Sequence, residues 1–143
     1  TVEILARDLE LMKEMQIDMS GMGPFIPHGQ TPLKNGIAGS VSMTLKMLAT
    51  ARLYMPWLLL PATTSLATLH PQGRELALRA GANVIMPNVS PEEFRSLYQI
   101  YPGKLNTHDS IVEYRKKITA LIEAEGRTVA TDFGHSMHPA FHQ

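Results

Sequence analysis

Two adjacent hydroxyl residues, Thr63 and Thr64, are the polar pair with the clearest chemical use. They follow the apolar run WLLLP at 57–61, which predicts a strand buried on both faces. Hydroxyls at the carboxyl end of such a strand, together with loop N–H groups, would bind a carboxylate or a phosphate. The alternative is that both threonines serve β-propensity and local side-chain-to-backbone hydrogen bonds. Residue type alone leaves both interpretations open.

Tyrosines and methionines form a second set of candidates. Tyr98 and Tyr101 are spaced about one helical turn apart, which lets both phenols point the same way. Such a pair usually packs at the edge of a core with its hydroxyls in water. Met19, Met22 and Met86 lie in or beside expected strands, where methionine most often fills gaps in a core. A ligand wall is the minority interpretation for both groups.

Histidines cluster near the end of the chain. His135, His138 and His142 fall close together, but a metal site needs three or more donors on a fixed scaffold. Residues 128–143 show no periodicity, so we expect a flexible tail and no metal site. No Ser–His–Asp set, phosphate-binding loop or paired-carboxylate arrangement stands out elsewhere.

The stretch IDMSGMGPFIPHGQTPL at 17–33 combines a short apolar run with a turn rich in glycine and proline. Its prolines remove N–H donors, so it cannot continue as a regular strand. Phe25 and Ile26 offer a flat apolar surface beside this backbone. The pattern suits the carboxyl end of a barrel strand, where α/β barrels hold ligands. A strand end followed by a structural loop is the alternative.

Composition excludes several classes of function. A chain of 143 residues is enough for one domain with a core. Its 13 basic and 13 acidic residues cancel, which gives no general attraction to nucleic acid or to an anionic membrane. No apolar run approaches the roughly 20 residues of a membrane span, and no signal-peptide layout is present. We therefore expect a cytoplasmic protein without a nucleic-acid or membrane partner.

Helical and strand patterns alternate three times, which indicates βα units and a parallel α/β sheet. The sheet would be either a small open α/β sandwich or part of a barrel. Thr1 is the expected cap of the first helix and Asp109 of the last, which Gly126 closes. We expect helices over 1–15, 40–54, 72–80, from 90 to before 102, and from 109 to 126, with strands at 17–22, 57–61 and 82–86.

Four segments together resemble the HydE family of radical S-adenosylmethionine (SAM) enzymes, which are maturases of iron–iron hydrogenases. Biotin synthase and methylornithine synthase are more distant relatives. The resemblance covers the chain to about Gly126, in the same order and with similar spacing. The segments are GMGPFIPHGQTPL at 21–33, LLLPATTSLATL at 58–69, GRELALRAGANVIMPN at 73–88 and FRSLYQIYPGK at 94–104.

The resemblance implies a fold. It predicts the C-terminal part of a (βα)₈ TIM-type barrel, with about three parallel strands and flanking helices, plus a C-terminal helical cap. On this interpretation residues 1–105 form a partial radical SAM barrel, 106–127 the helical cap region and 128–143 the flexible tail.

The resemblance also implies roles for single residues. Met19 and Ile26 match residues that line the SAM and substrate cavity, with Pro24 and Phe25 beside the adenosine. Thr63 and Thr64 match a pair that contacts an anionic group inside the barrel. Met86, Tyr98 and Tyr101 match cavity residues near the substrate.

Departures from the family pattern limit the expected activity. The family holds a 4Fe–4S cluster in a CxxxCxxC loop near the first strand, and this sequence contains no cysteine. Where many members of the family have cysteines for an accessory cluster, this sequence has Asn106, Tyr114 and Lys117. Clusters of this type need thiolate ligands, so neither can form on this chain alone. We expect a fragment or an expressed half that is inactive alone.

The expected partners and alternatives follow from this. The chain would associate with the missing N-terminal half-barrel or with itself, and would act on a small-molecule substrate with SAM as cofactor. The alternatives are a fragment of a methylornithine-synthase-like or biotin-synthase-like enzyme, or a small α/β module that binds an anion or a nucleoside.

Overall fold

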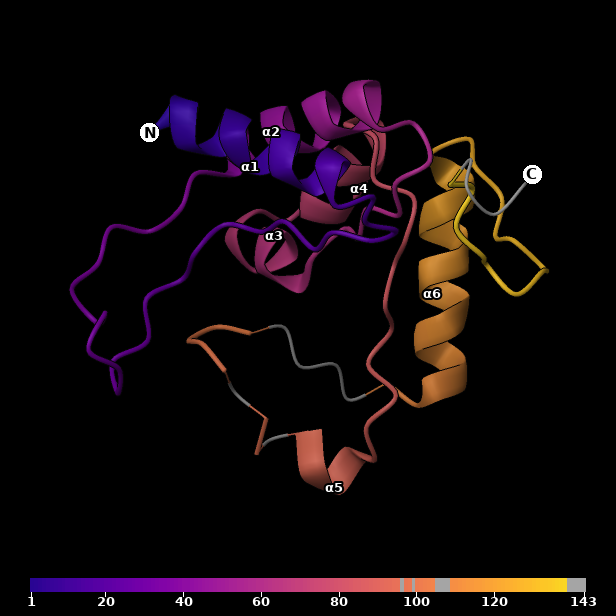
Figure 1. Cartoon of the computed structure of the whole chain (residues 1–143). Coiled ribbons are helices and arrows are strands. Elements are labelled where there is room, and N and C mark those ends of the chain that lie inside the picture. The colour runs from indigo at the N-terminus through magenta and orange to yellow at the C-terminus, as the bar shows by residue number, and fades with distance from the viewer. Residues whose placement is uncertain (96, 99, 105–108, 139–143) are drawn as a thin grey trace.

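A computed structural model describes residues 1–95, 97, 98, 100–104 and 109–138, and this part of the chain contains six helices (Figure 1). They are α1 (Val2–Glu14), α2 (Val41–Tyr54), α3 (Thr64–Leu69), α4 (Gly73–Arg79), α5 (Glu92–Arg95) and α6 (Ile111–Ala124).

Side-chain caps explain where the long helices begin. The hydroxyl of Thr1 accepts from the Ile4 N–H, and that of Ser40 accepts from the Met43 N–H. α6 begins with a reciprocal capping box between Ser110 and Glu113. The cap predicted at Thr1 is therefore confirmed, whereas the cap of α6 is Ser110 and not Asp109. Ser110 replaces it because its hydroxyl accepts from the third helical N–H while Glu113 reaches back.

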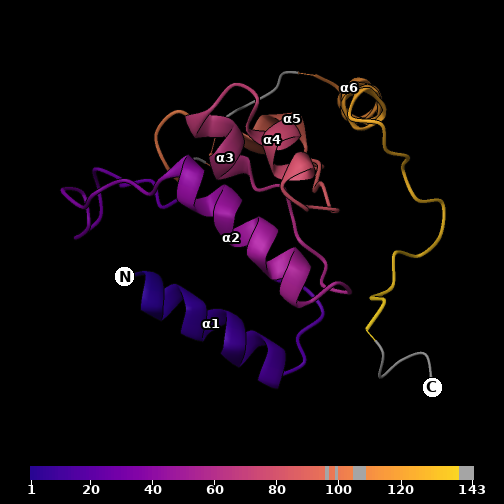
Figure 2. The same ribbon diagram turned by 90° about the horizontal axis from the view of Figure 1, so that it is seen from above.

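The core lies between α2 and the extended segment that follows it. Leu48 of α2 and Met55, which caps the end of that helix, are fully buried and belong to one cluster with Leu58, Leu60 and Leu66. α1 runs beside α2 (Figure 2) and adds Leu9 to the same cluster. α4 contacts both α2 and α3. The apolar periodicity of the sequence thus faces inward in these elements.

Three extended segments cross under this helical layer, at 17–22, 58–62 and 82–86. They run parallel and are joined by single bridges, Met19 to Leu59 and Pro61 to Val84. The Leu59 N–H donates to the Asp18 carbonyl at 2.8 Å, and the Ser20 N–H donates to the Leu59 carbonyl at 3.0 Å.

The prediction of three regular strands is wrong for the part of the chain that the structure describes, which is mostly helical and has no named strand. Pro61 lacks an N–H, so the ladder from segment 17–22 stops after Leu59. On the other side, the Leu60 N–H donates to the Asn83 side-chain oxygen at 2.8 Å and not to a backbone carbonyl. Each pairing is therefore limited to an isolated bridge.

Two further elements differ from the predicted ones. Thr64 begins a short helix, α3, where a strand tip and loop were expected. The helix predicted from residue 90 is the single turn of α5. Residues 87–95, 97, 98 and 100–104, which we call the arm, project away from the helical layer (Figure 1).

The end of the described chain packs at the amino-terminal side of segment 58–62. The ring of His138 meets the ring of Trp57 edge-on, with centroids 5.0 Å apart, and His138 is only 5% exposed. Arg127 donates to the carbonyls of Leu78 and Ala82. None of the described helices has the length and apolar character needed to cross a membrane.

Candidate functional site

A pair of hydroxyls lies where segments 17–22 and 58–62 both end. The Thr63 hydroxyl is 3.1 Å from the Ser65 hydroxyl and donates over 3.5 Å to the Met22 carbonyl. Thr63 occupies the N-cap position of α3, but its side chain makes no capping hydrogen bond. The hydroxyl therefore contacts the Met22 carbonyl of the neighbouring segment and the Ser65 side chain, and does not cap a backbone N–H of α3.

Gly23 forms the wall of this hydroxyl pair. A Cβ at position 23 would lie 2.8 Å from the Thr63 hydroxyl oxygen and would overlap the Ser65 hydroxyl oxygen. The close approach of the 22–24 backbone to both hydroxyls thus requires glycine.

Thr64, the other expected member of the pair, has a different environment. It is the first residue of α3, and its carbonyl accepts from the Thr68 hydroxyl at 3.0 Å. Ser65 was not among the residues expected at the site. The available signal was a third hydroxyl two positions after Thr63, which the turn into α3 brings back beside it.

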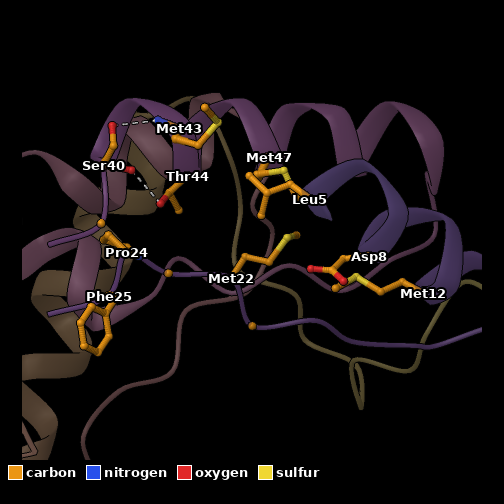
Figure 3. Close-up of a pocket in the computed structure, with 13 residues that line it drawn as sticks. Leu5, Asp8, Met12, Met22, Pro24, Phe25, Ser40, Met43, Thr44 and Met47 are labelled. Carbon is orange, nitrogen blue, oxygen red and sulfur yellow. Dashed lines mark hydrogen bonds between the residues drawn. The ribbon is translucent and has the colours of Figure 1, made fainter. Parts of the chain in front are cut away.

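A cavity of about 330 Å³ opens beside the hydroxyl pair, between α1, α2 and segment 21–25 (Figure 3). Its walls are mostly thioethers and small residues, and Asp8 is the single charged residue among those that line it. Pro24 is buried in the wall, and Ser40, the cap of α2, lies near it. Met12, Met22, Met43 and Met47 complete the apolar lining.

The four residues expected beside SAM fall in different places. Pro24 and Phe25 line the cavity, although the Phe25 ring also lies against Gly36, where an added Cβ would be 3.2 Å from the ring. Ile26 is half-buried in the projecting loop that the Gly39 N–H closes onto the Phe25 carbonyl at 2.8 Å. Met19 is not among the residues that line this cavity.

Met19 belongs to an open face of the extended segments. Side chains alternate along extended backbone, so Met19 and its bridge partner Leu59 share the side opposite Leu58 and Leu60, which face the helices. Met19 is 47% exposed. By the same alternation the third segment adds Val84 and the exposed Met86 to this open face, defined here as Met19, Leu59, Val84 and Met86. Pro61, the bridge partner of Val84, lies on the same side but is fully buried, so the face is exposed at Met19 and Met86 and covered between them.

The two expected tyrosines lie on the arm. α5 ends at Arg95, so the helical spacing that would align Tyr98 with Tyr101 is absent. The Tyr98 ring is exposed and lies 4.2 Å under the Lys104 ammonium, which also donates to the Tyr98 carbonyl. Burial lowers the pKa of Lys104. Tyr101 is half-buried.

The arm is held at its base by Arg95. Its buried guanidinium donates to the Ser90 carbonyl at 2.8 Å and to the Asp109 carbonyl at 2.7 Å.

The expected substrate residues are thus divided between two regions. Thr63 is in contact with Ser65 and Gly23, whereas Tyr98 and Tyr101 lie on the arm.

No metal site is visible in the residues that the structure describes, which contain no group of three His, Cys, Asp or Glu side chains able to hold an ion. His138 packs on Trp57, whereas His142 lies outside the described residues. Of the accessory-cluster positions, Asn106 is also outside them. The Tyr114 hydroxyl accepts from Arg74 at 2.7 Å, and Lys117 is paired with Asp109.

Comparison with known proteins gives one clear similarity. No protein-family model matches the sequence. Over 134 residues the chain is 46% identical to the [FeFe] hydrogenase maturase subunit HydE of Thermotoga maritima. The aligned region takes in 94% of this chain but only 38% of the length of that protein, within its C-terminal half.

Proposed function

Because the chain is HydE-like over nearly its whole length, we propose that it forms the C-terminal part of a radical SAM enzyme that acts in hydrogenase maturation. The observation that carries the proposal is the 46% identity over 134 residues to a hydrogenase maturase subunit. In this role the chain supplies part of the SAM and substrate cavity used in assembling the hydrogenase cluster, and it is inactive alone.

The open face supports the proposal that the three extended segments are the last three strands of a barrel. Met19 and Met86 are large apolar side chains left exposed beside half-buried Leu59 and Val84. Contiguous exposed apolar surface marks a place where another part of a protein packs. Parallel segments with helices on one side and the exposed Met19 and Met86 on the other match one arc of a barrel. On this proposal residues 1–105 belong to the barrel, 106–127 to its cap and 128–143 to a tail.

The iron–sulfur cluster of the family does not fit this chain. Such clusters need thiolate ligands, and the sequence has no cysteine. We therefore propose that the ligands come from a separate segment, which closes the barrel against the open face. Self-association would cover the same face and is the competing arrangement.

The nucleoside portion of SAM fits better. A cavity of about 330 Å³ lies within the range of small-molecule sites, and its apolar walls suit an adenine ring. Pro24 and Phe25 would hold the adenosine, with Ile26 in the adjoining loop. Met19 lies on the other side of segment 17–22, so its proposed cofactor contact would form in the closed barrel and not in this cavity. When bound with the cluster, SAM supplies radical chemistry; the residues of this chain bind it, orient it and exclude water.

Substrate contacts are proposed for two regions. Thr63 and Thr64 would contact an anionic group of the substrate, because hydroxyls are donors to carboxylate or phosphate oxygens. Met86, Tyr98 and Tyr101 would line the substrate side of the cavity once the arm is covered. Burial of the arm would place the Tyr98 and Tyr101 phenols in a drier environment, where their hydrogen bonds are stronger.

The test is reconstitution from two parts. This chain is co-expressed with the segment of Thermotoga maritima HydE that precedes the aligned region, the cluster is rebuilt anaerobically, and release of 5′-deoxyadenosine is measured. We expect SAM cleavage only when both parts are present. The matched control replaces the cluster cysteines of the added segment with alanine. Cleavage by this chain alone, or two parts that neither associate nor cleave SAM, would contradict the proposal.

A further inference from the structure

We propose that residues 127–138 form a strap that closes the amino-terminal end of the extended segments and keeps water out of it. The strap is anchored at Arg127 and at His138, and the chain between these two residues contains no helix or strand. The docking of the strap is independent of the proposed function. Its meaning rests on that function, because in a barrel this end is the floor, opposite the end that holds ligands.

The first anchor ties the strap to the start of segment 82–86. Gly126 follows α6 with φ +69°, in the left-handed region, so the chain turns away from the helix there. The Arg127 guanidinium then donates to the Leu78 carbonyl at 2.7 Å and to the Ala82 carbonyl at 3.3 Å. These carbonyls lie in the last turn of α4 and in the first residue of segment 82–86. The strap therefore begins at the amino-terminal end of that segment.

The second anchor lies at the start of segment 58–62. The ring of His138 meets the Trp57 ring edge-on, and the His138 N–H donates to the Ser136 hydroxyl at 3.2 Å. Figure 2 shows the yellow chain after α6 running back toward the turn at the end of α2, which leads to Trp57. Segments 58–62 and 82–86 run parallel, so both anchors lie at the same edge. The strap thus spans the amino-terminal ends of two neighbouring segments.

Side chains between the anchors show that the docking is specific. Phe133 is 94% exposed and Met137 is 67% exposed, whereas the more polar His138 is only 5% exposed. The ring of His135 lies near the exposed Phe133 ring, with centroids 5.9 Å apart. A chain that collapsed through hydrophobicity alone would bury the phenylalanine before the histidine. The burial of His138 is therefore set by the place at which it meets Trp57.

The group that the strap covers is the indole of Trp57. Its N–H is shielded from solvent, and in the described part of the chain it has no hydrogen-bond partner. Burying a donor without a partner is unfavourable, so this nitrogen stays dry only while its surroundings exclude water. Because no hydrogen bond to the described residues protects the N–H, its exchange with solvent reports the access of water to this end of the segments.

The experiment measures exchange of the Trp57 indole N–H with D₂O by ¹H–¹⁵N NMR in the whole 143-residue chain, which has a single tryptophan. We expect exchange at least about a hundredfold slower than in the urea-unfolded chain. His138→Ala and Arg127→Ala each remove one anchor and should speed exchange about tenfold or more. The matched control is His135→Ala, a histidine of the same strap outside the anchors, which should change the rate less than about twofold. Unchanged amide spectra of α1 and α2 show that each variant is folded.

Chymotrypsin gives an independent measurement, because Phe133 is exposed but lies between the two anchors. A protease must draw several residues of chain into its cleft, so cleavage after Phe133 should be about tenfold faster in His138→Ala than in wild type. Mass spectrometry identifies the cut.

Two results would overturn the inference: wild-type indole exchange as fast as in the unfolded chain, or equal exchange rates in His138→Ala and His135→Ala. The two-part SAM assay keeps the outcomes separate. Restored SAM cleavage with an unprotected indole refutes only the strap. A protected indole without SAM cleavage refutes only the proposed function.

Discussion

The two groups of expected substrate residues lie on regions built in opposite ways. Thr63 follows directly on the buried run of Leu60 and its neighbours, and α3 behind it contributes the fully buried Leu66. On the arm, Leu97 is 80% exposed and Tyr98 61% exposed. The chain itself fixes the geometry around Thr63. The arm is held at its base by Arg95 and approaches α3 at Gly103, where an added Cβ would lie 3.8 Å from the Thr68 side chain, while its large apolar side chains stay exposed.

This difference teaches which parts of a shared site a partial chain can preorganise. Hydroxyl contacts at the tip of segment 58–62 are set by local backbone and by the core beneath it. Contacts from the arm depend on burial that the described residues do not provide. A variant should therefore affect folding when it lies in the first region, and affect association when it lies in the second.

The largest expected effect comes from Leu60→Ala. Removing a fully buried leucine side chain costs about 2–5 kcal/mol of unfolding free energy, because transfer energy is lost and a cavity remains. Urea unfolding followed by circular dichroism measures it. The matched variant on the arm, Leu97→Ala, should change stability by less than about 0.5 kcal/mol. If Leu60→Ala and Leu97→Ala lost the same unfolding free energy, the two regions would not differ in how firmly they are packed.

A smaller loss is expected from Gly81→Ala in the turn after α4. Gly81 has φ +111°, and a Cβ there would lie 2.7 Å from the Arg52 Cβ. Strain of this kind costs about 1–3 kcal/mol, visible as a lower melting temperature. Gly29→Ala is the control, since an added Cβ meets nothing within 4 Å. If the melting temperature of Gly29→Ala falls as far as that of Gly81→Ala, backbone strain at Gly81 is not the cause.

The link between α4 and α6 should depend on pH. Arg79 donates to both carboxylate oxygens of Glu125, at 2.6 and 2.7 Å, and this holds the pKa of Glu125 below its ordinary value of 4.5. A lowered folded-state pKa means stabilisation that is full above the unfolded pKa and lost as pH falls through the folded one. Glu125→Gln should therefore be less stable than wild type at pH 7, with a difference that shrinks toward pH 3. The pH dependence of urea midpoints tests this, and a difference that grows in acid would contradict it.

The smallest effect on stability, and the sharpest on association, is expected from Tyr98→Ala. Its ring is exposed and contacts Lys104, so unfolding should change by less than about 0.5 kcal/mol. In the two-part complex the same change should weaken association and let chymotrypsin cut the arm faster. Tyr54→Ala is the matched control, because Tyr54 is an exposed tyrosine of α2 whose ring likewise lies under a lysine, Lys13 at 3.9 Å. If Tyr98→Ala associates with the other part as tightly as wild type does, the arm is not in the interface between the two parts.

Much of the helical fold was predictable from sequence because its determinants are local. The predicted ranges 1–15 and 40–54 match α1 and α2 to within a residue, and the hydroxyl cap predicted at Thr1 is present. Strand pairing was not predictable in the same way. The ladder ends because Pro61 has no N–H to donate and because the Asn83 side chain takes the N–H of Leu60, and both depend on which segments become neighbours.

The site divides similarly. Thr63 could be selected as a candidate from the sequence because it follows a buried run, which is a local pattern. Ser65 was missed as its partner because the pairing needs the turn into α3 and the approach of Gly23 from a segment about 40 residues earlier. Tyr98 and Tyr101 were placed together by a helical spacing that a single turn of helix does not sustain.

The contact of Trp57 with His138 gives this molecule a built-in optical reporter. Trp57 is the single tryptophan of the sequence, so the indole emission of the whole chain comes from one place. That place is the amino-terminal end of the run that carries Thr63 at its other end. Emission that stays constant when the two parts associate would mean that the Trp57–His138 contact is the same in the free chain and in the complex. A shifted spectrum would mean that association changes the surroundings of Trp57.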